Sequence, residues 1–290
     1  MIDKKNSEHK WVSFMELVLK CVDKVTVTDT IYYSTYFKIS PQMYMDNIQT
    51  KGPGNELAYY IYHIGAAYLS GDEYAQNIVI KKDAKAIVTT VSPNTIYKCK
   101  DGEFVYQEEY TQVDENAYLT YVTDDIIAFK SARYQQKNIF KLSSKAHLIY
   151  SDMIGPGWSQ ADSKTFEFDW IKFRCEFYVD DELIKLDNLR IEPKELEIND
   201  LGYMDGFLYM PSVFVFDERI DDKLILDLRQ YLKKTIKFEH KVGISKLDKN
   251  ALVIRALTKM EEDGNLLVII CVNWIRHHLW KMAEINFKKY

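Results

Sequence analysis

The chain has 290 residues, of which 47% are hydrophobic and 28% charged, and its formal net charge is -5. This length accommodates one large domain or two smaller ones, and the composition is typical of a globular protein. The acidic balance argues against nonspecific binding to nucleic acid, which needs a basic face to displace phosphate counterions. The longest apolar run, residues 266–272, is far shorter than the ~20 residues of a membrane-spanning helix. We therefore expect neither nucleic acid nor a membrane as a partner.

The N-terminus and the cysteines indicate a reducing compartment. The first eleven residues lack the apolar core of a secretory signal. Four cysteines are scattered widely, without a Cys-x-x-Cys pair: Cys21, Cys99, Cys175 and Cys271. This pattern favours reduced, buried thiols over a disulfide or zinc framework. We expect a cytoplasmic location.

Strand-like segments begin early in the chain. Three of them are rich in β-branched and aromatic residues and predict strands: 25–28, 32–39 and 57–69. Gly65, near the end of the third segment, allows a close approach of another backbone. Gly71 and Asp72 predict a tight turn, because glycine accepts positive φ and aspartate bonds its own backbone.

A repeat then follows with a period of about 30 residues. Each copy reads as strand, short polar turn, small alanine and strand, and the alanines that we align are Ala86, Ala117 and Ala146. Such a period in β-type sequence predicts units that stack and bury one another's faces. The fold class that we predict is mainly β, a β-helix-like stack of strands. Chance similarity between alternating strands is the alternative explanation.

The C-terminal part has a different pattern. A one-sided apolar stripe, capped by Asp221 or Asp222, predicts a helix. Two strands follow, and a second helix is expected to be capped by Asp263 or Asn265. We predict a β-helix-like domain over 1–215 and a helix-strand-strand-helix layer over 216–290, packed together as one continuous domain.

Catalytic motifs are missing from the sequence. It contains no G-x-S-x-G, HExxH, Walker A or GxGxxG motif. The one histidine pair, His277-His278, lies in the second predicted helix, where adjacent side chains point about 100° apart and do not easily chelate one ion. A storage-type or structural metal site is therefore not supported.

Acidic residues at strand ends are the most suggestive polar group: Asp72, Asp124, Asp125, Asp152 and Glu167. Stacked units bring some of them together, and a line of carboxylates passes a divalent cation weakly from one to the next. The alternative is that they are ordinary turn-forming, solvated acids. The residues alone leave both interpretations open.

Several motifs occur in the order found in one family. Tyr32-Tyr33-Ser34 is followed by GAAYLSGDEY at 65–74, and then by TTVS at 89–92 with IYK at 96–98. This succession resembles the urease accessory protein family UreD, also called UreH, and the similarity covers roughly residues 20 to 205. Positions that keep the family pattern are Gly65, Gly71, Asp72, Thr89, Thr90, Ser92 and Tyr97. Positions that depart from it are Ala66, Ala67, Glu73, Val91 and Thr95.

The resemblance implies a chaperone that matures urease and is not itself an enzyme. Members of the family are scaffolds that hold a UreF-type helical protein and, through it, a UreG-type GTPase that carries nickel. The assembly docks on apo-urease, and nickel is thought to follow an internal path. On this reading no cofactor is bound stably, nickel passes transiently, and Asp72, Asp125 and Asp152 line or shape the path.

Two other classes of protein remain open from the residues alone. One is a carbohydrate-binding or carbohydrate-cleaving β-solenoid, in which Tyr and Trp stack on sugars and Asp124 and Asp125 act as acid and base. The other is a plain structural oligomerisation module.

Overall fold

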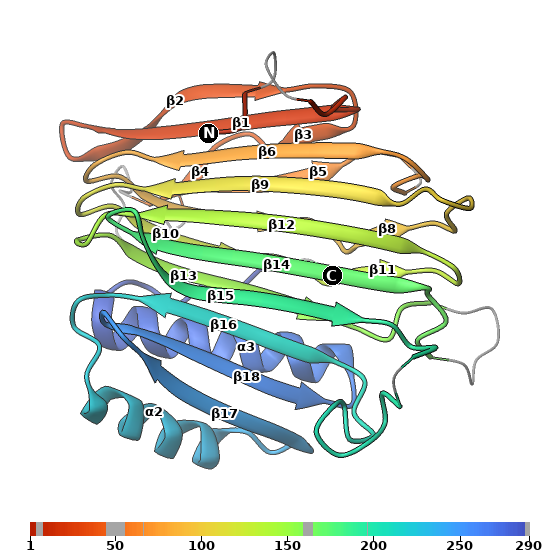
Figure 1. Cartoon of the computed structure of the whole chain (residues 1–290). Coiled ribbons are helices and arrows are strands. Elements are labelled where there is room, and N and C mark those ends of the chain that lie inside the picture. The colour runs from red at the N-terminus through yellow and green to blue at the C-terminus, as the bar shows by residue number, and fades with distance from the viewer. Residues whose placement is uncertain (4–7, 45–55, 66, 159–164, 196, 288–290) are drawn as a thin grey trace.

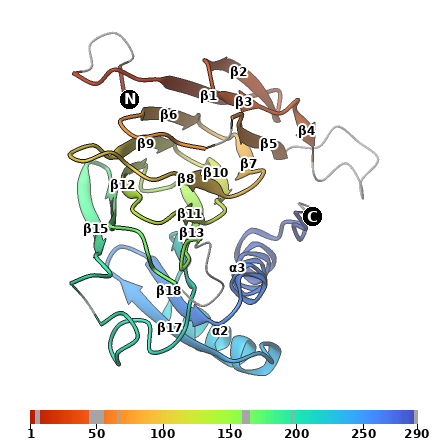
Figure 2. The same cartoon turned by 90° about the vertical axis from the view of Figure 1, so that its right-hand side faces the viewer.

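The computed structural model describes residues 1–3, 8–44, 56–65, 67–158, 165–195 and 197–287. Two large sheets face each other and form a flattened stack of strands (Figures 1 and 2). The chain passes from one sheet to the other and back, and each turn adds a strand to both. The predicted β-helix-like stack is therefore confirmed.

Sheet A is built mostly of parallel strands. Its order is β15 (Glu182–Ile191), β14 (Trp170–Val179), β12 (Arg133–Leu142), β9 (Val105–Val113), β6 (Glu73–Ile80), β1 (Ser13–Val22) and β2 (Val25–Tyr33). Neighbours from β14 to β1 are parallel, whereas β15 and β2 pair antiparallel at the two edges.

Sheet B has eleven strands. Its main path is β17 (His240–Leu247), β18 (Ala251–Thr258), β16 (Met210–Phe216), β13 (His147–Ile154), β10 (Tyr118–Val122), β7 (Lys85–Thr90), β5 (Glu56–His63) and β3 (Phe37–Ile39). Three short strands lie off this path: β4 (Met43–Tyr44), β8 (Asn94–Ile96) and β11 (Ile126–Ala128). Strands β8 and β11 lie at one narrow side of the stack, where the chain returns from sheet B to sheet A (Figure 2).

The repeat is present, but one copy is displaced by two residues from our alignment. Strands β7, β10 and β13 stack in parallel, and the register pairs Leu119 with Ala86. The alanine equivalent to Ala117 and Ala146 is Ala84, whose carbonyl accepts the Tyr118 N–H at 2.9 Å. A slip of two residues keeps every side chain on the same face, so alternation alone does not reveal it.

The C-terminal helices cover the outer face of sheet B (Figure 2). Helix α2 spans Asp222–Thr235, and α3 spans Glu261–Ile275 and continues into a π-helical turn, η1 (Arg276–Trp280). Asp221 caps α2, as predicted, by accepting the Leu224 N–H at 2.7 Å. The predicted caps of α3 were wrong: the helix begins before Asp263 and Asn265, and its N-cap is Met260, which makes no side-chain cap. The strongly apolar body of α3 packs on sheet B and fixes the helix without a cap.

Several smaller predictions also have an outcome. The segment 32–39 is not one strand, because β2 ends at Tyr33 and β3 begins at Phe37. All four cysteines are free thiols, and three of them are buried. Within the described ranges, no helix combines the length and the apolar character that crossing a bilayer requires. Ala66 lies outside the described residues. Strand β16 runs through residue 215, and β17 and β18 extend sheet B. The division into two parts at residue 215 stays a prediction.

Two apolar cores hold the layers together. The larger core lies between the sheets and includes inward side chains of β1, β9 and β12 such as Leu17, Val113 and Phe140. The second core joins sheet B to the helices and includes Val215 and Val272. Burial of such side chains contributes about 1.5–3 kcal/mol each.

Candidate functional site: a polar chamber between the sheets

The interior between the sheets is not apolar throughout. In β9 the inward positions read Val105, Gln107, Glu109, Thr111 and Val113, so three polar side chains lie between two valines. None of the three polar residues is more than 4% exposed. Buried polar groups are costly unless they are hydrogen-bonded, and a cluster of them in a core points to a function.

Strand register extends this polar position across sheet A. Glu109 pairs with Gln76 of β6 on one side and with Asn138 of β12 on the other. Asn138 pairs in turn with Cys175, and Cys175 with Asp187. Because parallel strands stack in register, these residues form a polar row that runs along the axis of the stack.

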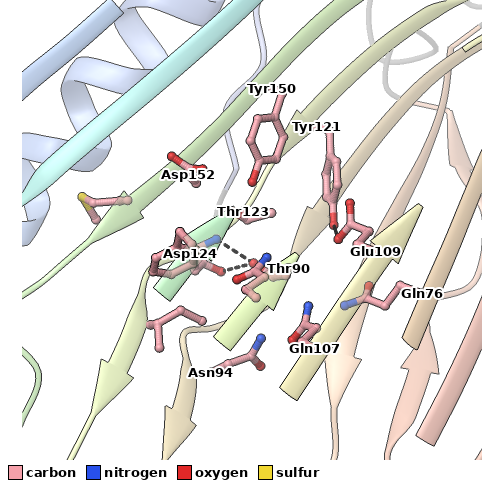
Figure 3. Close-up of a pocket in the computed structure, with 14 residues that line it drawn as sticks. Gln76, Thr90, Asn94, Gln107, Glu109, Tyr121, Thr123, Asp124, Tyr150 and Asp152 are labelled. Carbon is pink, nitrogen blue, oxygen red and sulfur yellow. Dashed lines mark hydrogen bonds between the residues drawn. The ribbon is translucent and has the colours of Figure 1, made fainter. Parts of the chain in front are cut away.

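Sheet B contributes the opposite wall. A small cavity of about 30 Å³ lies between the two sheets, and we call it the chamber (Figure 3). The labelled polar residues that line it are Gln76, Thr90, Asn94, Gln107, Glu109, Tyr121, Thr123, Asp124, Tyr150 and Asp152. A cavity of this size holds about one water molecule or one small ion.

Hydrogen bonds fix Glu109 in the chamber wall. Tyr121 Oη donates to Glu109 Oε2 at 2.9 Å, and Thr111 Oγ1 donates to Oε1 at 3.1 Å. Burial raises the pKa of Glu109 to about 7, although these two donors act in the opposite direction. A carboxyl group with this pKa exchanges protons near neutral pH.

The amides beside Glu109 form a connected network. Tyr134 Oη donates to the side-chain carbonyls of Gln107 and Gln136, both at 3.1 Å. Gln136 donates to Asn138 Oδ1 at 3.0 Å, and Asn138 donates to Tyr150 Oη at 3.0 Å. Gln76 Oε1, which lies at the other side of Glu109, is buried and has no hydrogen-bond partner among the residues that the structure describes. This carbonyl oxygen is therefore free to bind a guest in the chamber.

The chamber borders a groove that opens to the surface. The groove, about 230 Å³ in volume, lies between sheet B and α3, and its walls include Val122, Leu266 and Ile269. Thr123, Asp124, Asp152 and Met153 line both cavities. The two acids therefore stand between the chamber and the groove. Burial raises the pKa of Asp152 to about 6, against the attraction of Lys185.

A salt bridge closes the stack at the β15–β18 side. Arg255 of β18 pairs with Asp187 of β15, so the pair joins sheet B to sheet A. Lys185 also contacts Asp187, at 3.1 Å, and its ammonium lies 4.8 Å from the centre of the Phe177 ring. Arg255 and Lys185 outnumber Asp187 by one positive charge, and the charge of Lys185 also reaches Asp152.

The three acids that we expected to form a metal path are not brought together. Asp152 lines the chamber. Asp125 lies among Gly155, Tyr209 and Glu261, and its Oδ1 is buried without a partner. Burial and the charges of Glu261 and Asp124 raise its pKa to about 7. Asp72 closes a turn, where it accepts the Tyr74 hydroxyl at 2.7 Å and the Leu69 N–H at 2.9 Å.

The motif residues also separate. Thr90 lines the chamber and donates to Asp124 Oδ2 at 2.8 Å, whereas Thr89 donates to the Val122 carbonyl at 2.6 Å on the opposite face of sheet B. Ser92 is exposed in a bend, and Tyr97 lies at the narrow side. Gly65 and Gly71 have φ of +135° and +81°, which glycine adopts without strain. Neither the predicted glycines nor Ser92 touches the chamber.

Sequence reasoning missed Gln107, Glu109, Gln136 and Asn138. The sequence did contain a signal for these residues. In β6, β9 and β12, apolar residues identify the alternate positions that face inward, and polar residues occupy some of those positions. The aromatic residues of β9, Tyr106 and Tyr110, occupy the other set of alternate positions and do not mark the inward face. The structure places the inward side of β9 at the intervening positions. Of the other acids at strand ends, Asp124 lines the chamber together with Asp152, whereas Glu167 pairs with Lys130. No group of three or more His, Cys, Asp or Glu side chains that could hold a metal occurs among the described residues.

A stack of parallel strands with an internal polar chamber and two covering helices defines the class of protein, a β-solenoid built around a buried polar interior. The family model described as UreD urease accessory protein matches residues 13–287, and the chain therefore belongs to the UreD family. This membership implies a role in urease maturation.

Curated relatives agree with the family match. The urease accessory protein UreD of Streptococcus salivarius is 30% identical over 260 residues, which cover 90% of this chain and 91% of that protein. The protein of the same name from Staphylococcus saprophyticus is 31% identical over 257 residues, covering 87% of this chain and 88% of that protein. The similarity thus extends through the C-terminal layer, beyond the region in which we recognised the motifs.

Proposed function

We propose that the protein is a urease maturation chaperone in the cytoplasm. It acts as a non-catalytic scaffold that links apo-urease to a nickel-delivery complex of a UreF-type protein and a UreG-type GTPase. Nickel passes transiently through the polar chamber on its way to the urease active site. The observation that supports this proposal is a buried polar chamber, lined by Glu109 among other polar residues, in a member of a urease accessory family.

The ligand chemistry of the chamber suits passage rather than storage. Ni²⁺ accepts carboxylate and imidazole ligands, and soft thiolates or several imidazoles hold transition metals tightly. The chamber offers the carboxylates of Glu109, Asp124 and Asp152 together with amide and hydroxyl oxygens, and neither His nor Cys is among the described residues that line it. Oxygen ligands of this kind attract a divalent cation without holding it as tightly as thiolates or several imidazoles do. The protein then needs no stably bound cofactor.

Asp124 and Asp152 supply the direction of transfer in this proposal. They stand at the boundary between the chamber and the groove beside α3. Beyond Asp152, on the β15–β18 side, Arg255 and Lys185 outnumber Asp187, so this side carries a net positive charge. Nickel therefore moves between the chamber and the groove rather than past the β15–β18 salt bridge.

The function is tested by co-expressing urease with its other accessory proteins, with and without this chain. The proposal expects nickel-free, inactive urease when the chain is left out. Full urease activity in its absence would rule the function out. Pull-downs from the same cells report separately whether the chain joins a complex with the UreF-type protein and apo-urease.

The path is tested by isosteric substitutions in the chamber. Glu109→Gln and Asp152→Asn remove the charge and keep the shape, so the complex is expected to assemble while the nickel content of urease falls several-fold. Glu115→Gln is the matched control, because Glu115 is an exposed acid paired with Lys82 and Lys145. Unchanged nickel content in both chamber variants contradicts the path and leaves the scaffold role standing.

A further inference from the structure

An apolar ladder runs along the narrow side of the stack, exposed at its two ends and half-buried in its middle. Its members are Leu69, Tyr97, Phe129 and Trp158, one from each of four successive turns of the chain. The ring centres of Tyr97 and Phe129 are 5.0 Å apart, and those of Phe129 and Trp158 are 4.6 Å apart. This side faces the viewer in Figure 2, where β8 and β11 mark its middle. We call these four residues the narrow-side ladder.

Backbone pairing sets the spacing of the ladder. The Tyr97 N–H donates to the Tyr68 carbonyl at 3.1 Å, and the Phe129 N–H donates to the Ile96 carbonyl at 3.0 Å. The Trp158 N–H donates to the Ala128 carbonyl at 2.9 Å. The ladder thus repeats with the strands, and its position is as rigid as the stack itself.

Gly157 allows Trp158 to stack on Phe129. Gly157 has a φ of +76°, and a Cβ atom at this position would lie 2.2 Å from the Ala128 carbonyl oxygen. Any other residue would push Trp158 away from Phe129. The local backbone therefore brings an indole to the surface and stacks it on the previous turn.

The ladder side chains are turned away from the core. The residues just before Leu69, Tyr97 and Phe129 are Tyr68, Ile96 and Ala128, and they are at most 1% exposed. Leu69 and Trp158, in contrast, are 49% and 50% exposed. A rigid, contiguous apolar strip that neither core nor chamber uses is typical of a binding surface.

The charged neighbours of the narrow-side ladder and the stacking of its rings indicate which kind of partner binds it. Lys98 and Lys130 follow Tyr97 and Phe129 directly and both are exposed, although the Lys130 ammonium already lies 3.5 Å from Glu167 Oε1. The rings of Phe129 and Trp158 are stacked with an interplanar angle of 29°, so they cover part of each other's faces. Sugar binding uses open ring faces, whereas aromatic residues beside basic ones are common at protein interfaces.

We propose that the narrow-side ladder is a protein-docking surface. Its partner is a protein segment that presents apolar side chains together with acidic side chains, which meet Lys98 and Lys130. This surface is separate from the nickel path, and the proposal that the partner belongs to the urease maturation assembly rests on the proposed function.

The test measures binding of the full-length chain to two purified probes, the UreF-type protein and apo-urease. Trp158→Ser and the double variant Phe129→Ser/Trp158→Ser are expected to weaken binding of one probe at least tenfold. Lys98→Glu/Lys130→Glu is expected to weaken it as well, and more strongly at low salt. Phe104→Ser is the matched control, since Phe104 is 40% exposed and lies beside Trp170, outside the ladder. Circular dichroism and the midpoint of thermal unfolding verify that each variant is folded.

Each remaining outcome counts against the proposal. Unchanged binding of both probes by folded ladder variants overturns the docking surface and leaves the proposed function intact. Failure of the unmodified chain to bind either probe overturns both. Binding of oligosaccharides on a glycan array, lost on Trp158→Ser, assigns the ladder to sugars instead. Self-association that is lost in the same variant assigns it to a second copy of the chain.

Discussion

Arg276, at the end of α3, forms a fully buried bidentate salt bridge with Glu56, the first residue of β5. The two nitrogen–oxygen distances are 2.7 and 2.6 Å, and Arg276 is 1% exposed. Arg276 also donates to Thr120 Oγ1 at 2.8 Å and to the Ala283 carbonyl at 3.0 Å. One guanidinium thus joins the C-terminal layer to β5 and β10 of sheet B.

Breaking this pair from one side is expected to destabilise the protein strongly. Arg276→Met leaves Glu56 buried without a counter-charge, and such a loss costs about 3–5 kcal/mol in the free energy of unfolding. The double variant Glu56→Met/Arg276→Met is expected to recover much of this loss, because no charge then remains buried. Urea denaturation of the single and double variants measures both effects. Lys82→Met, which removes an exposed pair with Glu115, serves as the control and should change stability by less than about 1 kcal/mol.

Glu109 is expected to make stability fall as the pH rises. Its pKa is about 7 in the folded protein and 4.5 when unperturbed, so the folded state binds the proton more tightly. The stabilisation is complete below the unperturbed pKa and is lost as the pH rises through the folded pKa. Glu109→Gln should therefore raise the midpoint of thermal unfolding at pH 8 and have little effect at pH 4.5. Thermal scans across this range measure the difference, and a gain confined to acidic pH would contradict the assignment.

Asp217 is expected to make stability fall as the pH decreases, which is the opposite of the effect of Glu109. Arg219 and His147 hold the pKa of its buried carboxyl well below the usual value, against the effect of burial. Trp280 donates to the same carboxylate at 2.9 Å. The stabilisation is present above the unperturbed pKa and is lost as the pH falls through the folded pKa. Asp217→Asn should therefore cost about 3 kcal/mol at neutral pH, and less as the pH falls toward 2. Chemical denaturation at several pH values measures this trend.

Gly264 sets how closely α3 approaches sheet B. A Cβ atom there would lie 2.6 Å from Met153 Sδ and 3.2 Å from Thr258 Oγ1. Gly264→Val is expected to cost about 1–3 kcal/mol through overpacking and to alter the groove that Met153 lines. Gly243→Ala is the control, since nothing lies within 4 Å of its Cβ position. Equal stability of the two variants, measured by urea denaturation, would contradict close packing at Gly264.

Alternation and the repeat were sufficient to predict the stacked architecture, because both depend on local spacing. The register of the repeat was harder to predict. Ala84 and Ala86 share a face of the sheet, and only the backbone pairing with Tyr118 shows which of them is equivalent to Ala117. The chamber was missed for a related reason. Gln107 and Glu109 look like solvated residues unless the inward side of β9 is known. Asp124 and Asp125 are adjacent in sequence, yet one lines the chamber and the other lies beside Gly155.

The monotonic order of the parallel strands has a consequence for synthesis. Strands β1, β6, β9, β12 and β14 are neighbours in the order in which the ribosome makes them. A nascent chain can therefore fold one turn of the stack at a time. The last strand of each turn leaves backbone N–H and C=O groups unpaired until the next turn is made, and such an edge tends to pair with other chains. Arg276 comes 220 residues after Glu56, so Glu56 has no counter-charge until translation has passed Arg276. A ribosome that stalls between these two residues would leave a stack with an open flank, prone to aggregate.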